Sequence, residues 1–560
     1  MARDERSILL TASLMAALMI FIQSCSKPWP TGSGDVVARR AMISSAHMAA
    51  SQAGLEMIKK GGNAVDAAVA AAFALSLAEP NASGLGGGGF MLIKMADEPE
   101  PVMIDYREAA PQKATPGYYY ESGQDFNSKA YQGASAVGVP GMVAGLSLAL
   151  KKFGTMSPVQ VMEPAIRLAR QGIRVSPKLQ VMILDNLEKI QKHPAAAAIY
   201  LPDGLPPEPG SLLKNEDLAK VLERIAQEGP AVFYEGNLAR VIVSEIQKLG
   251  GIMELDDLKN YQPKLRKPVS GTYRGYKIFS SAPPGGGTYL LELLNILEGF
   301  DLKSLGPQSD RLIHLLAEAM KMVFADQTRN SGDPDYYKIP VEILTDKNYA
   351  GKLRERIKEG VVRFDYKPLS FANSESESTS HMSVVDEHGN AAALTQSINS
   401  FFGTGIVVPG TGILLNNHMA DFDSKTGSPN SVGPARRPAS SIAPTIIIKD
   451  DRPFLIIGSP GATRIISAMA QIIINIVDFG FGLDEAIEAP RVHCLTKTLA
   501  IEGRISSAAV ETLKSWGHSV KLYPDWDNYF GGAQGILIDP KTRRLYGAAD
   551  SRRDGVAAGF

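Results

Sequence analysis

One threonine, Thr379, stands where a chain could convert its own residue into a nucleophile. It follows the polar run Asn373–Ser378 and precedes Met382–Asp386, whose alternating pattern predicts a strand. A threonine hydroxyl needs a base. Cutting the peptide bond before Thr379 would supply one, because a free α-amine has a pKa of roughly 7.7–8 and accepts a proton near neutral pH. The pattern is compatible with self-cleavage, although a threonine before a strand is most often only a strand former.

The segments around this threonine predict a mixed helix-and-sheet protein. Met382–Asp386 and Ala391–Ser397 form a hairpin pattern around a short polar turn. Upstream, Ala41–Ala78 predicts two helices that lead into the glycine-rich turn Asn81–Gly89. Downstream, Arg464–Val477 is apolar on nearly all sides, which predicts a buried helix. This order of elements indicates helices packed on both sides of stacked sheets.

Composition and the missing motifs exclude several functions. The chain has 560 residues, 44% hydrophobic and 21% charged, as in an ordinary globular protein of several domains or one large α/β body. Its net charge of −1 gives no field that would recruit nucleic acid. The sequence lacks nucleophile-elbow, phosphate-loop and zinc-protease motifs, and its eight histidines show no metal-ligand spacing. We therefore predict no metal and no cofactor.

The N-terminus predicts export. Two arginines in Met1–Arg6 precede the apolar run Ile8–Ile22, which has the length of a signal-peptide core and is short for a membrane span. Cys25 follows in a context similar to a lipoprotein cleavage site. We expect a signal peptide over residues 1–25, a periplasmic or extracellular protein, and a lipid tether at Cys25; the alternative is cleavage elsewhere and release. Cys494, the only other cysteine, is expected to be a buried structural thiol.

A series of ordered blocks resembles the γ-glutamyltranspeptidase family. Thr379–Asp386 (TSHMSVVD) is similar to the family's threonine-x-histidine-x-serine-valine-valine signature. Further similar blocks are Gly61–Val69, Gly84–Leu92, Asp105–Pro111, Gly138–Ala144, Phe402–Ile406, Gly412–Asn417, Arg437–Pro444 and Gly458–Arg464. Together they cover nearly the whole chain after the N-terminal segment. No single block would identify the family, but so many blocks in the family's order are a specific signal.

The resemblance implies an α/β N-terminal-nucleophile hydrolase, a four-layer αββα sandwich built from two subunits of one precursor. The cut would fall between Ser378 and Thr379, giving a large subunit, 26–378, and a small catalytic subunit, 379–560. Members of the family take a γ-glutamyl group from glutathione or similar amides onto the threonine. They then pass it to water, or to an amino acid or peptide, without a cofactor.

The family pattern also assigns roles by position. Thr379 matches the nucleophile, and Ser397 stands where a threonine hydroxyl usually orients it. Gly461 and Ala462 match the pair whose backbone N–H groups form an oxyanion hole, with alanine in place of the usual second glycine. The substrate-binding matches are Arg107, Ser440 and Ser441 for the α-carboxylate and Asn399, His418 and Asp421 for the α-amine.

Two departures leave the specificity open. His418 replaces a glutamine or glutamate; it contacts the amine or turns outward as a solvated loop residue. Only 18 residues separate Asp421 from Ser440, so the chain lacks the lid that many members form there. A lidless site predicts acceptance of extended γ-glutamyl chains. The alternatives are therefore an acylase on glutaryl or cephalosporin amides and a poly-γ-glutamate hydrolase. A non-enzymatic binding protein with a dead site is a further hypothesis, which the intact Thr379, Arg107 and Gly461 oppose.

Overall fold

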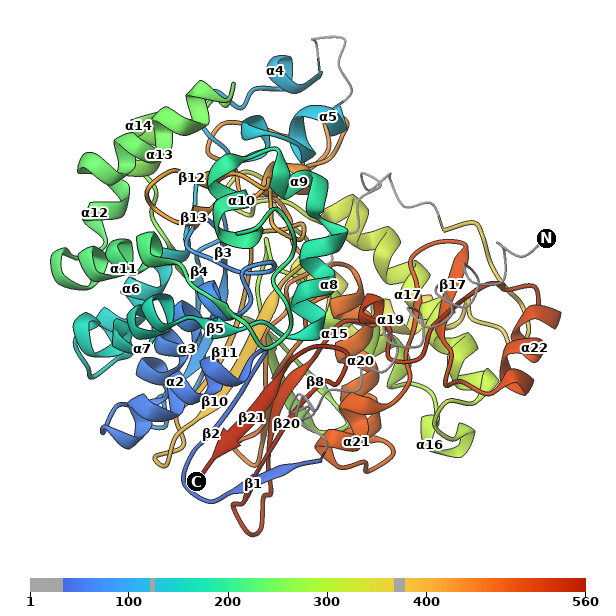
Figure 1. Ribbon diagram of the computed structural model, residues 1–560. Coiled ribbons are helices and arrows are strands. Elements are labelled where there is room, and N and C mark those ends of the chain that lie inside the picture. Colours follow the sequence, from blue (N-terminus) through green and yellow to red (C-terminus); the bar gives the residue numbers. More distant parts are fainter. Residues whose placement is uncertain (1–33, 121–125, 367–377) are drawn as a thin grey trace, which may run out of the picture. The chain divides into compact units, whose positions relative to one another are not determined.

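The computed structural model describes residues 34–120, 126–366 and 378–560 (Figure 1). The predicted signal segment with Cys25, and most of the polar run before Thr379, lie outside the described residues. Within the part that is described, no helix combines the length and hydrophobicity needed to cross a membrane.

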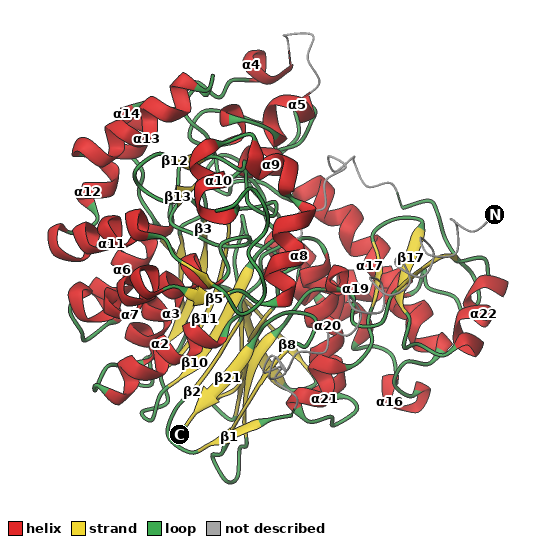
Figure 2. Cartoon of the chain, viewed as in Figure 1, coloured by secondary structure: helices red, strands yellow, loops and turns green. Residues whose placement is uncertain are grey.

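Two antiparallel sheets stand at the centre of the described chain (Figure 2). Among the described residues each has seven strands, in the orders β21-β2-β10-β11-β3-β4-β7 and β1-β20-β19-β15-β14-β9-β8. The first comprises β21 (Val556–Gly559), β2 (Met42–Ser45), β10 (Ser380–Val385), β11 (Ala391–Ser397), β3 (Gly88–Lys94), β4 (Val102–Asp105) and β7 (Lys264–Arg266). The second comprises β1 (Val36–Ala38), β20 (Leu545–Ala549), β19 (Gln534–Ile538), β15 (Arg452–Gly458), β14 (Thr445–Lys449), β9 (Tyr276–Ser280) and β8 (Val269–Tyr273). The sheets stack face to face, with β10 and β11 over β15 and β19.

Helices cover both outer faces. The first sheet carries α2 (Met48–Lys59), α3 (Ala64–Ala78) and α6 (Met142–Phe153), with α7 (Pro158–Gln171) and α11 (Glu216–Glu228) packed outside them. The second sheet carries α15 (Gly287–Leu297), α20 (Arg464–Val477) and α21 (Leu483–Glu488), and α17 (Asp310–Asn330) packs on α15. These are the four layers, αββα, that the family resemblance implied.

Strand alternation divides the core between these layers. In β3, Met91 and Ile93 join the cluster under the first helical layer, whereas Phe90 and Leu92 join the cluster between the sheets. Such alternation follows from side chains that point to opposite faces at successive residues. Because both faces of this sheet are covered, every residue of β3 is buried, and the strand appears in the sequence as a continuous apolar run.

The hairpin prediction is confirmed and one helix prediction is partly wrong. β10 and β11 pair with Ser380 opposite Gln396, so the strand begins directly after Thr379. The segment Ala41–Ala78, predicted as two helices, begins instead with strand β2, which pairs with β10 and β21. Its four residues are all buried. Four residues, of which two are apolar and two are serines, are too few to show a strand period, so the pattern did not separate this segment from the helix that follows.

Candidate active site

Thr379 lies at the N-terminal end of β10, in the middle of the first sheet, and is buried. The Thr379 hydroxyl donates a short hydrogen bond to the Ser378 carbonyl oxygen and lies 3.3 Å from the Ser397 hydroxyl. Ser397, at the end of β11, donates to the same carbonyl at 2.9 Å. Two hydroxyls therefore converge on the carbonyl of the predicted cleavage site.

Asn399 fixes the other side of this junction. Its carbonyl accepts a short hydrogen bond from the Ser378 hydroxyl, and its N–H donates to the Ser397 hydroxyl at 2.9 Å. Its side chain donates to the Asn417 carbonyl at 3.0 Å. Asn399 has φ of 77°, in the left-handed region that asparagine tolerates better than most side chains. The antiparallel pairing of β10 and β11 already places these strand ends side by side, and the turn directs the chain leaving β11 so that the Asn399 carbonyl reaches Ser378.

A cavity of about 290 Å³ opens beside Thr379. Its lining includes these predicted site residues: Thr379, Ser397, Asn399, His418, Asp421, Arg107, Ser440, Ser441 and Ala462. They come from separate segments of the chain, at the ends of strands and in the loops between them. Gly461 precedes Ala462, which does line the cavity. The structure thus brings the predicted residues to one place, while the role of each stays a prediction.

Arg107 and Asp421 form an ion pair at the wall of the cavity. The guanidinium makes a short contact with the Asp421 carboxylate, and two further N–H groups, on Nε and Nη2, point at the Pro438 and Ala439 carbonyls, both at 3.3 Å. The Arg107 side chain is 1% exposed and that of Asp421 is 26% exposed. A fixed cation beside a fixed anion matches a substrate that carries a carboxylate and an ammonium on one carbon.

His418 points inward and is buried. Its Nδ1 lies 2.9 Å from a carboxylate oxygen of Glu108, and the second Glu108 oxygen lies 3.5 Å from the Arg107 guanidinium. The alternative of a solvated, outward-facing His418 is therefore wrong, because the ring on helix η2 (His418–Asp421) is buried beside Glu108. Sequence reasoning missed Glu108, although it directly follows Arg107 in the same family block.

The predicted oxyanion pair forms the turn between β15 and α20. Gly461 has φ of 124° and Ala462 has φ of 50°. Their carbonyls accept the amides of Arg464 and Ile465, which starts the helix. An alanine in the left-handed region costs about 1 kcal/mol more than glycine. The alanine side chain thus fits this turn at the expense of local strain, and its backbone N–H is retained.

A second group of residues lies on the opposite side of the Thr379 backbone; we call Glu79, Ser380 and Arg553 the rear network. Ser380 donates a short hydrogen bond to Glu79, whose other oxygen lies 3.3 Å from Arg553. The same guanidinium approaches the Thr379 carbonyl at 3.5 Å. Burial raises the pKa of Glu79 to about 7, although Arg553 and Ser380 oppose the shift. Sequence reasoning missed this network, because Glu79 and Arg553 stand in no recognised motif and Ser380 fills the unspecified position of the threonine-x-histidine signature.

A buried threonine at the start of a central strand, inside stacked sheets covered by helices on both faces, is the arrangement of an N-terminal-nucleophile hydrolase. Within that class the chain belongs to the γ-glutamyltranspeptidase family, because the model for gamma-glutamyltranspeptidase matches residues 50–560.

The chain is similar over most of its length to characterised relatives of two kinds. A glutathione hydrolase proenzyme of Escherichia coli (strain K12) is 41% identical over 547 residues, which span 94% of this chain and 93% of that relative. An Acylase ACY 1 proenzyme of Pseudomonas sp. (strain SE83) is 40% identical, with 95% and 94% covered. Among solved structures, a cephalosporin acylase from Bacillus halodurans superposes with a TM-score of 0.88 at 29% identity, covering 96% of this chain and 98% of that one.

Proposed function

We propose that this protein is a self-cleaving γ-glutamyltransferase and glutathione hydrolase with Thr379 as its nucleophile. The observation that carries the proposal is the Arg107–Asp421 pair in the same cavity as Thr379. A γ-glutamyl group has an α-carboxylate and an α-amine on one carbon, and a carbonyl three carbons away. The pair would hold the charged end while the reacting carbonyl reaches Thr379.

Maturation uses the two hydroxyls at the Ser378 carbonyl. The Thr379 hydroxyl oxygen attacks that carbonyl carbon, and the C–N bond breaks as the threonine nitrogen takes up a proton. This shift leaves an ester between Ser378 and Thr379. Water then hydrolyses the ester, which frees the Ser378 carboxylate, the Thr379 hydroxyl and the Thr379 α-amine. Ser397, which donates to the carbonyl oxygen at 2.9 Å, stabilises the negative charge that develops there.

Turnover repeats the same chemistry on a bound amide. The Thr379 α-amine takes the hydroxyl proton, and the oxygen attacks the γ-carbonyl. Backbone N–H groups of Gly461 and Ala462 hold the oxyanion, a contribution of about 3–4 kcal/mol for one such donor. The leaving amine departs with a proton, and a γ-glutamyl ester of Thr379 remains. Water or an acceptor amine then releases the group. Ser440 and Ser441 join Arg107 at the α-carboxylate, and Asn399 and His418 join Asp421 at the α-amine.

Processing gives two chains, 26–378 and 379–560, and no cofactor takes part. The N-terminal segment supports export to the periplasm or beyond, with Cys25 as the lipid attachment point. The 18-residue segment after Asp421 folds back close to its start, where Asp423 bridges Ser431. A short segment of this kind supports access by long γ-glutamyl chains, and hence a poly-γ-glutamate hydrolase activity alongside the main one.

An acylase activity is the second candidate function, favoured by the similarity to acylase proenzymes. A matched substrate pair separates the two, because a glutaryl group differs from a γ-glutamyl group only by lacking the α-amine. The experiment compares γ-glutamyl-p-nitroanilide with glutaryl-p-nitroanilide, each with and without glycylglycine. We expect strong preference for the γ-glutamyl compound and stimulation by glycylglycine. Equal or better cleavage of the glutaryl compound would show that Asp421 does not contribute to recognition of the substrate α-amine.

A further inference from the structure

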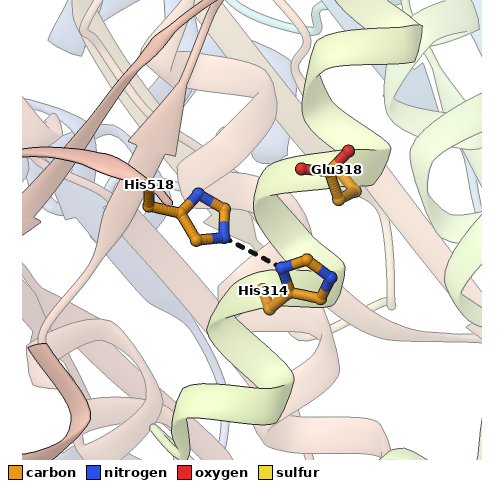
Figure 3. Close-up of side chains that lie close together, drawn as sticks. All are labelled: His314, Glu318 and His518. Carbon is orange, nitrogen blue, oxygen red and sulfur yellow. Dashed lines mark hydrogen bonds between the residues drawn. The ribbon is translucent and has the colours of Figure 1, made fainter. Parts of the chain in front are cut away.

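Three residues whose side chains can bind a metal lie close together in the structure, outside the lining of the cavity beside Thr379. His314 and Glu318 lie one turn apart on α17, and His518 lies between α22 (Ser507–Ser515) and β18 (Ser519–Tyr523). His314 Nδ1 is 2.9 Å from His518 Nε2, and the dashed line in Figure 3 marks this hydrogen bond. One nitrogen from each ring and one Glu318 carboxylate oxygen all lie within 4.8 Å of one another, and all three residues are buried. The two histidines are 204 residues apart, so sequence spacing could not reveal the cluster.

The two rings share one hydrogen bond, so only one of the two facing nitrogens has a free lone pair. His314 Nε2 lies 3.0 Å from the Lys358 carbonyl, so it must carry the proton to make that hydrogen bond. Metal-ligating histidines characteristically donate their other N–H to a carbonyl in this way. His314 Nδ1 is then unprotonated and accepts from His518 Nε2–H, and zinc can bind this His518 nitrogen only after its proton has moved to Nδ1 of the same ring.

Two imidazoles and a carboxylate are a ligand set for zinc. Zinc–nitrogen bonds of about 2.0–2.1 Å with tetrahedral angles place two ligand nitrogens roughly 3.3 Å apart. The present separation of 2.9 Å needs only a small opening. The Glu318 carboxylate must close the rest of the gap by rotating toward the rings. Water would take the fourth position.

Lys321 is the residue that opposes a cation here. Its ammonium holds Glu318 at 2.5 Å and also donates to the Arg363 carbonyl at 2.6 Å. Zinc would take Glu318 away from this ion pair, while Lys321 keeps the carbonyl. The positive charge of Lys321 then weakens zinc binding, because like charges repel strongly where water is excluded.

We propose that His314, Glu318 and His518 form a zinc site. Its position gives the site a structural role that rests on the proposed cut before Thr379. His314 and Glu318 belong to the chain before the cut, and His518 belongs to the chain after it. A bound zinc ion would therefore connect the two subunits of the mature enzyme.

Zinc added to the metal-stripped full chain tests the site directly. We expect about one zinc per chain by elemental analysis after dialysis, and a higher unfolding midpoint with zinc than with a chelator. Cobalt in its place should give the visible absorption of a tetrahedral centre. His518→Gln should abolish stoichiometric binding. His493→Gln is the matched control, because His493 is equally buried but bonds Ser467 outside the cluster and should leave binding unchanged. Lys321→Met should tighten zinc binding at least several-fold.

The outcomes separate this proposal from the proposed function. The uncut Thr379→Ala precursor should also bind zinc, since both histidines are already together in it; if wild type proves uncut yet binds zinc, only the processing proposal fails. In cut protein, a chelator should lower the denaturant concentration at which the two chains separate. A wild-type chain that takes up no stoichiometric zinc, or a His518→Gln variant that binds as much as wild type, would overturn the site and leave a hydrogen-bonded histidine pair.

Discussion

The two sides of Thr379 differ in kind. In front, the cavity is lined by side chains from strand ends and loops, and its central ion pair, Arg107 with Asp421, is partly open to solvent. Behind, Glu79 and Arg553 hold the start of β10 through Ser380 and the Thr379 carbonyl. Both sides contain ion pairs, but Asp421 is 26% exposed at the cavity, where a substrate can reach it, whereas Glu79 and Arg553 are more deeply buried. We infer that the residues lining the cavity determine which substrate reacts, and that the rear network determines the position of Thr379.

Replacing the nucleophile should have the largest effect. It should abolish the chemistry in the cavity and leave the rear network unchanged. Thr379→Ala should remain one uncut chain, with activity lower by at least about 10³-fold, because neither the attacking oxygen nor a free threonine amine exists. A denaturing gel and N-terminal sequencing check it. Wild type should yield a small fragment beginning Thr-Ser-His-Met, and Thr379→Ser should still be cut. A small fragment from Thr379→Ala would place the cut elsewhere.

Arg107→Lys should have the second-largest effect, because lysine keeps the positive charge in the cavity but loses the planar two-point contact with a carboxylate. We expect kcat/KM for γ-glutamyl-p-nitroanilide to fall about 100-fold, mainly through KM, with processing intact. Arg437→Lys is the control. Arg437 is also buried and pairs with Asp105 at 2.6 Å, but it does not line the cavity, so its KM should match wild type. An unchanged KM for Arg107→Lys would remove Arg107 from substrate binding.

The same contrast explains what the sequence could predict. Front residues such as Thr379, Arg107 and Ser440 stand in motifs whose residue types match a reaction, so resemblance placed them in one site and the structure brings them together. The sequence does not single out Glu108, because only the fold shows that it contacts His418. Glu79 and Arg553 are 474 residues apart, and the residues around each of them give no indication that the two side chains pair. The layers were predictable from patterns, whereas β2 was not, since four buried residues leave no period.

The rear network should make stability depend on pH. The raised pKa of Glu79, about 7, means that the folded protein holds this proton more tightly than the unfolded chain does, where 4.5 is usual. The resulting stabilisation is complete below pH 4.5 and is lost as the pH rises through 7. Between pH 5 and 8 this amounts to about 2 kcal/mol.

Glu79→Gln removes this titration, so its free energy of unfolding should change less over that range by a similar amount. Urea unfolding of the uncut Thr379→Ala protein, with and without Glu79→Gln, avoids the complication of two chains. Glu56→Gln is a partly exposed control whose pKa is lowered by Lys60 and Arg167, and it should not flatten the profile. Parallel profiles with and without the Glu79→Gln substitution would mean that Glu79 is ionised throughout and that the rear is an ordinary ion pair.

His418 provides the smallest and most discriminating test of the front. Its ring lies between Glu108 and the cavity, so it can either contact the substrate amine or merely occupy Glu108. Glutamine keeps a donor for Glu108 but changes the shape offered to the amine. We expect His418→Gln to change KM for the donor by less than about tenfold, because glutamine can still offer an acceptor to the substrate ammonium, with kcat and processing unchanged. His418→Leu should also lower the stability, because an apolar side chain then replaces the polar ring that lies 2.9 Å from the buried Glu108 carboxylate. If both variants share the wild-type KM and only His418→Leu is destabilised, His418 serves Glu108 alone, and amine recognition rests on Asp421 and Asn399.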